Sequence, residues 1–71
     1  MHKYFVGIIG LGVGEEHLKK YLKIRNCKIL LIYDKNKKKL NEISKKYKVN
    51  HCNNENEIFS NNKINLVSVA S

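Results

Sequence analysis

Short apolar runs alternate with amphipathic segments along the chain. Residues 4–10 form an apolar run rich in β-branched residues, which predicts a buried strand. Between residue 15 and about residue 24, Leu18, Tyr21 and Leu22 recur at helical spacing with lysines opposite, as in an amphipathic helix. Residues 28–33 predict a second buried strand, which ends at Asp34.

The second half of the chain continues this alternation. Asn36 can cap a helix that runs to about residue 48, and residues 49–52 predict a short third strand. Asn54 and Glu57 resemble a capping box that opens a brief helical turn. Residues 64–70 predict a fourth strand.

The predicted elements therefore follow the order β-α-β-α-β-(α)-β. Apolar strands that alternate with amphipathic helices predict an α/β fold with a parallel sheet and right-handed crossovers. We expect one half of a parallel, doubly wound, Rossmann-like domain, with the strands in the order 3-2-1-4. The 71 residues allow one small domain, and no linker divides them.

The composition narrows the classes of protein. Fourteen Lys and Arg residues against six Asp and Glu residues give a net charge of +8, but only Arg25 could bind phosphate in a bidentate fashion. Such a lysine excess is usually a solvated surface, and a small basic nucleic-acid-binding domain is the alternative. We do not expect nucleic acid as the partner, because no aromatic stacking platform accompanies the charge.

The segment after Lys3 imitates a short signal peptide, but its four glycines make a poor signal helix. The two cysteines cannot build a disulfide framework. No apolar run approaches the ~20 residues that cross a bilayer, which excludes a membrane span. We therefore expect a cytoplasmic protein without a membrane partner.

The residues that carry chemistry lie at the turn between the first strand and the first helix. Gly10, Gly12 and Gly14 alternate there, and the acid Asp34 ends the second strand. This is the context of a dinucleotide-binding turn. Gly10 would allow the sharp turn, Gly12 would let the backbone approach a pyrophosphate, and N–H groups near Val13 would face that anion. Asp34 would accept hydrogen bonds from the adenosine ribose.

Other interpretations of this turn stay open. A plain strand–helix turn, with Asp34 capping the next helix, needs no ligand. The usual pattern has its third glycine where Glu15 stands, so the site closes with one residue fewer or the helix starts earlier. We expect Glu15 and Glu16 to point outward. S-adenosylmethionine-dependent methyltransferases share the glycine spacing, but they usually carry an acid at the position of Ile8.

Three segments resemble the N-terminal part of the glucose–fructose oxidoreductase / inositol dehydrogenase / MocA (Gfo/Idh/MocA) family. They are VGIIGLGVGEEHLKKY (residues 6–21), ILLIYDKNKKKLNEISKKYKV (residues 29–49) and INLVSVAS (residues 64–71). The resemblance implies an NAD(P)-dependent oxidoreductase that acts on a sugar, a cyclitol or a sugar derivative.

The resemblance also assigns site residues. The implied cofactor contacts are Gly10, Gly12, Val13, Gly14, Asp34, Lys35, Lys39, Ala70 and Ser71. Lys35 and Lys39 fall where some relatives contact adenosine or a 2′-phosphate, which leaves NADP as the second candidate. The carboxylate of Asp34 would repel that phosphate and favours NAD.

The family's catalytic elements, a Glu-Lys-Pro motif and a second α/β domain, are not found in this chain. We therefore expect residues 1–71 to be the N-terminal portion of an NAD(P)-binding Rossmann domain, truncated after the fourth strand, with no catalytic residue of its own. A sugar-like substrate would bind only to a full-length protein. The exposed edge of the fourth strand would favour self-association. The non-catalytic alternative is a nucleotide-sensing module, like those attached to potassium channels.

The remaining candidate residues have structural explanations. We expect His17 to pack the first helix on the sheet, because a lone histidine carries no mechanism. Cys27, His51 and Cys52 lack the paired spacing of zinc ligands, so we expect no metal site.

Overall fold

The computed structural model describes residues 3–70, so the predicted cofactor contact of Ser71 lies outside the described residues. The elements are β1 (Tyr4–Ile9), α1 (Gly14–Leu22), β2 (Cys27–Tyr33), α2 (Lys37–Tyr47), α3 (Asn56–Phe59) and β3 (Leu66–Val69). The two long helices, the brief helical turn and three of the four predicted strands are confirmed, with ends shifted by at most two residues.

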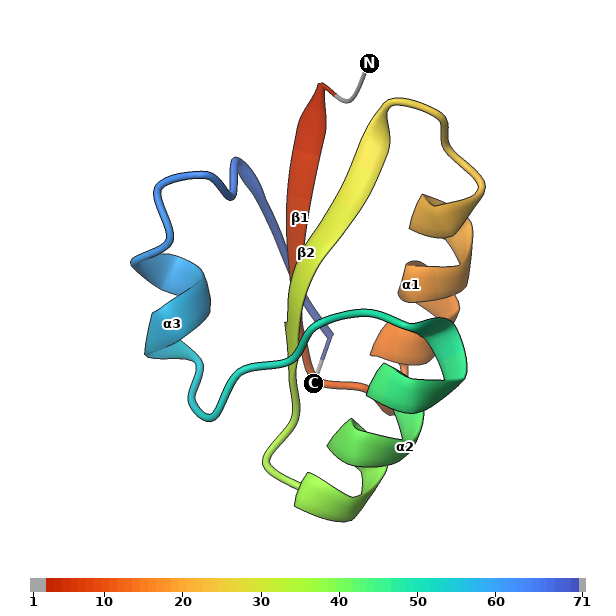
Figure 1. The fold of residues 1–71 in the computed structure, drawn as a ribbon, viewed down its shortest axis with the longest axis vertical. Helices are drawn as coiled ribbons and strands as arrows, with labels where there is room; N and C mark the ends of the chain where they lie inside the picture. Colours follow the sequence, from red (N-terminus) through yellow and green to blue (C-terminus); the bar gives the residue numbers. More distant parts are fainter. Residues whose placement is uncertain (1–2, 71) are drawn as a thin grey trace.

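Three parallel strands form one sheet in the order β2-β1-β3. Figure 1 shows α1 and α2 on one face of this sheet and α3 on the other. The predicted α/β class is confirmed, and the arrangement is that of a Rossmann-like half. All three strands are parallel, so their carboxyl ends lie together at one end of the sheet.

The predicted four-stranded order 3-2-1-4 is not confirmed. The segment predicted as the third strand contributes a single parallel bridge, between His51 and Ile32. Two hydrogen bonds of 3.1 Å hold it there, from Ile32 N–H to the Asn50 carbonyl and from Cys52 N–H to the Ile32 carbonyl. The segment follows the left-handed cap of α2 at Lys48, with φ of 56°, and enters the turn before α3 directly. Too few residues remain between these two turns to pair with β2 over the length of a strand.

The core lies on both faces of β1, the central strand. On the side of α1 and α2, Val6, Ile8, Leu18 and Ile32 are fully buried in one cluster. On the opposite side, Ile58 of α3 is 1% exposed. It packs against Gly7, where an added Cβ would lie 2.5 Å from Ile58 Cγ2. The glycine in the middle of β1 therefore lets α3 approach the sheet closely.

We predict that Gly7→Ala destabilises the protein by about 1–3 kcal/mol, because the added methyl group overpacks the contact with Ile58. Urea unfolding followed by circular dichroism measures this loss. Gly12→Ala is the matched control, since an added Cβ there meets nothing within 4 Å. Equal unfolding free energies for Gly7→Ala and the wild type would contradict the prediction.

β3 lies at one edge of the sheet, and Val67 is 36% exposed. Unpaired backbone groups beside exposed apolar side chains favour pairing with a second copy. We predict concentration-dependent association of the 71-residue chain in sedimentation velocity. Val67→Lys weakens it, whereas Ile24→Lys, at a residue 46% exposed between α1 and β2, leaves it unchanged. A monomer at every concentration would contradict this.

Candidate functional site

β1 ends in a turn that requires glycine. Gly10 has φ of 89°, in the left-handed region where a side chain would be strained. Its N–H donates to the Tyr33 carbonyl at 2.8 Å, which joins the start of the turn to the end of β2. Leu11 follows with no exposed surface, and its burial in the core holds the turn down on the sheet.

The other two glycines of the turn have different surroundings. An added Cβ at Gly12 would meet nothing within 4 Å, so the backbone there is open to a ligand. At Gly14, an added Cβ would lie 3.2 Å from Ile8 Cγ2 and 3.7 Å from the Cβ of Ala70, so this glycine lets α1 pack closely on the strands. Close helix–strand packing is the task of the third glycine in a dinucleotide-binding turn, and here Gly14 performs it one position early.

The N-terminus of α1 directly follows the glycine turn, and no side chain caps it. Val13 is the N-cap residue, in helical conformation, and no side chain accepts a cap hydrogen bond there. The first N–H groups of the helix carry a partial positive charge. They are therefore suited to hold an anion such as a pyrophosphate.

Asp34 connects the end of β2 to the glycine turn. Its Oδ2 accepts a hydrogen bond of 2.7 Å from the N–H of Leu11, and its Oδ1 accepts one of 2.8 Å from the N–H of Asn36. Asn36 in turn caps α2, because its side chain accepts from the N–H of Lys39. Asp34 thus stabilises two turns. Each carboxylate oxygen has a second lone pair, which leaves acceptor capacity for ribose hydroxyls.

A cleft of about 770 Å³ opens at the carboxyl ends of the strands. This volume lies in the range of cofactor sites, ~300–1,000 Å³. The predicted site residues that line the cleft are Gly10, Gly12, Val13, Asp34, Lys35 and Ala70. Gly14 packs beneath the cleft against Ile8, and Lys39 is not among the lining residues.

The cleft also contains residues that the sequence pattern did not indicate. Asn54, Glu55 and Asn56 form a polar part of its wall at the start of α3. Two hydrogen bonds shape this segment: Asn54 Oδ1 accepts from Glu57 N–H at 3.1 Å, and Glu57 Oε2 accepts from Asn53 N–H at 2.9 Å. Their place in the chain is the one feature that could have indicated this role. They follow the segment predicted as the third strand, and ligands bind beyond the carboxyl ends of parallel strands.

Glu15, in the first turn of α1, turns toward α2. Its Oε2 accepts hydrogen bonds from the Tyr47 hydroxyl at 2.7 Å and from Lys46 Nζ at 3.2 Å. These two bonds hold the pKa of Glu15 below its ordinary value, and the Tyr47 pKa is raised by the same carboxylate. Glu16 pairs instead with Lys19 at 3.5 Å. Both acids therefore have lysine partners, which reduces their repulsion of an anion at the helix end.

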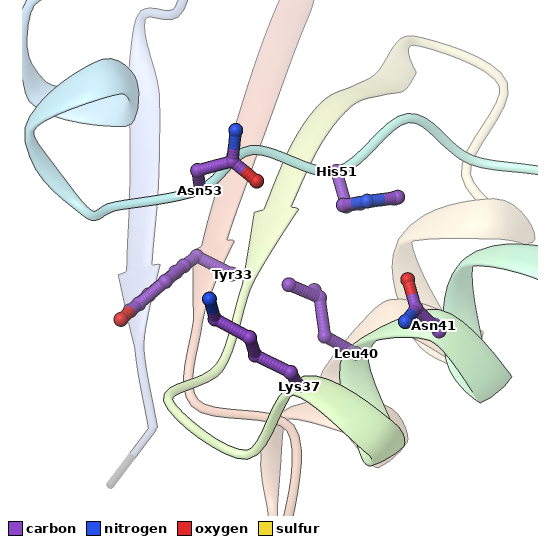
Figure 2. Close-up of a pocket in the computed structure, with 6 residues that line it drawn as sticks. All are labelled: Tyr33, Lys37, Leu40, Asn41, His51 and Asn53. Carbon is purple, nitrogen blue, oxygen red and sulfur yellow. The ribbon is translucent and has the colours of Figure 1, made fainter.

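A second hollow, of about 100 Å³, shares Tyr33 with the cleft. Figure 2 shows Lys37, Leu40 and Asn41 rising from α2 toward the segment that carries His51 and Asn53. The Nδ1 of His51 lies 3.1 Å from Ser44 Oγ, whose own proton goes to the Val49 carbonyl, so this histidine helps to close the end of α2. The hollow is too small for a nucleotide.

Neither cysteine lies in a metal-binding group within the described part of the chain. Among residues 3–70, no three His, Cys, Asp or Glu side chains come together in a geometry that would hold a metal ion. Burial raises the pKa of the Cys52 thiol, whose Sγ lies 3.2 Å from the Asn54 carbonyl.

Among residues 3–70, no helix has the length and apolar character needed to cross a membrane.

A protein-family model described as an oxidoreductase family with an NAD-binding Rossmann fold matches residues 5–71. This chain belongs to the Gfo/Idh/MocA family. The match includes the whole glycine turn and Asp34, and membership supports a nicotinamide dinucleotide as the cofactor of this Gfo/Idh/MocA domain. A comparison with curated proteins returned no match. The open backbone at Gly12, the uncapped α1 and the oriented Asp34 carboxylate fit that cofactor.

The lowered pKa of Glu15 predicts an acid-dependent loss of stability. The ionised carboxylate of Glu15 stabilises the fold at pH values above its ordinary pKa of 4.5. This contribution disappears as the pH falls through the lowered pKa. We predict that Glu15→Gln lowers the thermal midpoint at neutral pH and that its difference from wild type shrinks as the pH falls below 4.5 through the lowered pKa. Glu42→Gln, on the exposed side of α2, is the control. A difference that stays constant with pH would contradict the assignment.

Proposed function

We propose that this chain binds the adenosine and pyrophosphate part of NAD, as the cofactor domain of an oxidoreductase that acts on sugars, cyclitols or sugar derivatives. One observation carries the proposal: the Asp34 carboxylate is fixed beside the glycine turn, at the wall of a cleft that can hold a cofactor. Family membership supports the redox chemistry, and the substrate class rests on the resemblance to sugar and cyclitol oxidoreductases.

Each wall of the cleft has a separate task in this proposal. The N–H groups at the start of α1 bind the pyrophosphate, and Gly12 lets it approach the backbone. Asp34 accepts hydrogen bonds from the adenosine ribose. Ala70, next to the close contact at Gly14, provides a small side chain on the facing wall. NAD, when bound, supplies the hydride acceptor of the reaction.

The hydride-transfer step needs more than these residues provide. A Rossmann domain binds the nicotinamide ring with its second βαβαβ half, whereas the three strands here form one half. We therefore propose that residues 3–70 bind and orient the cofactor and assign no catalytic residue among them. The unpaired Cys27 and Cys52 agree with the reducing cytoplasm, where we place the protein.

The anchored carboxylate also bears on the choice of cofactor. Two backbone N–H groups hold both oxygens of Asp34, so the side chain cannot turn away from the ribose without losing a hydrogen bond. A 2′-phosphate would meet this negative charge at short range. Lys35 lies in the same cleft and would offset part of the repulsion. We propose NAD as the preferred cofactor, with weaker binding of NADP.

Calorimetric titration with NAD, NADP and ADP-ribose tests the proposal. We expect NAD and ADP-ribose to bind, and Asp34→Ala to weaken NAD binding by about tenfold or more, which corresponds to about 1.4 kcal/mol. The same substitution narrows the preference for NAD over NADP, because the repelling charge is gone. Asp34→Asn, which keeps an oxygen for the Leu11 N–H, separates the loss of charge from the loss of the turn.

The controls distinguish the alternatives. Glu42→Ala, an exposed acid on α2, leaves NAD binding unchanged, and circular dichroism verifies that each variant is folded. Binding of S-adenosylmethionine alone would support a methyltransferase-like site. Salt-sensitive binding of nucleic acid, with no binding of NAD, would support a basic module that uses the exposed lysines of α1 and α2.

A further inference from the structure

His17 and Ser68 form a hydrogen bond that links two elements of the cleft. The Nδ1 of His17, on α1, lies 3.1 Å from the Oγ of Ser68, on β3, and the two residues are 51 positions apart in the chain. Both side chains are partly buried. Ser68 is the polar residue in the strand LVSV, and a partly buried hydroxyl in an apolar strand needs a partner. His17 provides that partner.

The two residues lie just behind the cleft. His17 is three residues after Gly14, about 4.5 Å along the axis of α1 from the turn that would hold the pyrophosphate. Ser68 is two residues before Ala70, which lines the facing wall. At the cleft itself α1 and the end of β3 already approach closely, because an added Cβ at Gly14 would lie 3.7 Å from the Cβ of Ala70. The hydrogen bond therefore joins the same two elements one helical turn deeper.

A contact at Gly14 alone would not fix the direction of α1. The nearest approach there involves small groups, and such a contact lets the helix tilt about it. Leu18 anchors α1 in the core, and the directional hydrogen bond at His17 adds an attachment to β3, which restrains the tilt of the first turn relative to that strand. The position of the helix N–H groups relative to Ala70 depends on that tilt.

We propose that His17 and Ser68 are positioning residues for the dinucleotide. They hold the start of α1 at a set distance from the end of β3, and the pyrophosphate then meets N–H groups that are already in place. Preorganisation of this kind raises affinity because binding orders fewer groups. The inference rests on the proposed function for its readout with NAD, and it also has a readout without NAD.

The binding experiment compares His17→Ala, Ser68→Ala and the double variant with wild type in NAD titrations. We expect each single variant to bind NAD about three- to tenfold more weakly, as for the loss of one hydrogen bond, and the double variant to bind no more weakly than the singles. His17→Asn keeps the affinity that His17→Ala loses, because the side-chain amide of asparagine takes the place of Nδ1 and can still bond Ser68 Oγ. It has no effect in the Ser68→Ala background.

Ile43→Val controls for a merely structural effect. Ile43 is a core residue of α2, 5% exposed, and its truncation lowers the thermal midpoint while leaving the NAD affinity of the folded protein unchanged. His17→Ala and Ser68→Ala variants that lower the midpoint but bind NAD like wild type would overturn the proposal.

A second measurement requires no cofactor. In His17→Ala, amide hydrogen exchange at Leu18 and Lys19, whose N–H groups bond back to the first turn of α1, becomes faster by several-fold, and His17→Asn reverses the change. Unchanged exchange at these amides would overturn the positioning role even if NAD binds. Faster exchange in a protein that binds no NAD would contradict the proposed function alone and would retain the mechanical link between α1 and β3.

Discussion

The hydrogen bond of 2.7 Å from Leu11 N–H to Asp34 Oδ2 is the constraint on which the cleft depends. It joins the turn after β1 to the residue after β2, and the bond from Gly10 N–H to the Tyr33 carbonyl reinforces the same junction. Leu11 is buried beneath, so its N–H has little freedom to move. One carboxylate therefore orders the glycine turn, and in the proposed function it also accepts hydrogen bonds from a ribose.

The charge distribution around α1 follows from this arrangement. The helix begins at Gly14 without a side-chain cap, so its positive end stays available. Glu15, which would oppose a pyrophosphate, is instead bound by Tyr47 and Lys46 of α2. The packing of the two helices on one face of the sheet (Figure 1) thus reduces the repulsion that Glu15 would exert on an anion in an isolated helix.

The glycine turn and Asp34 were predictable because their spacing within a strand–turn–helix unit has a local physical cause. The helix bounds were predictable for the same reason, since caps such as Asn36 act over three residues. Residues 49–52 show the limit of this reasoning. Their apolar pattern suits a strand, but the left-handed cap at Lys48 and the turn into α3 leave space for one bridge. A strand forms only where a neighbouring strand pairs with it along its length. The local pattern of apolar residues does not indicate whether such a neighbour is present.

The amino-acid sequence by itself determined the α/β class, the alternation of elements and the identity of the glycine turn, because these depend on hydrophobic periodicity and on local backbone preferences. Only the tertiary structure decided that Gly14 performs the packing task of a third glycine and that Asn54–Asn56 complete the cleft. It also decided that His17 meets Ser68, 51 positions along the chain. Contacts between residues so far apart arise when the sheet is assembled, and that assembly depends on the packing of the whole chain.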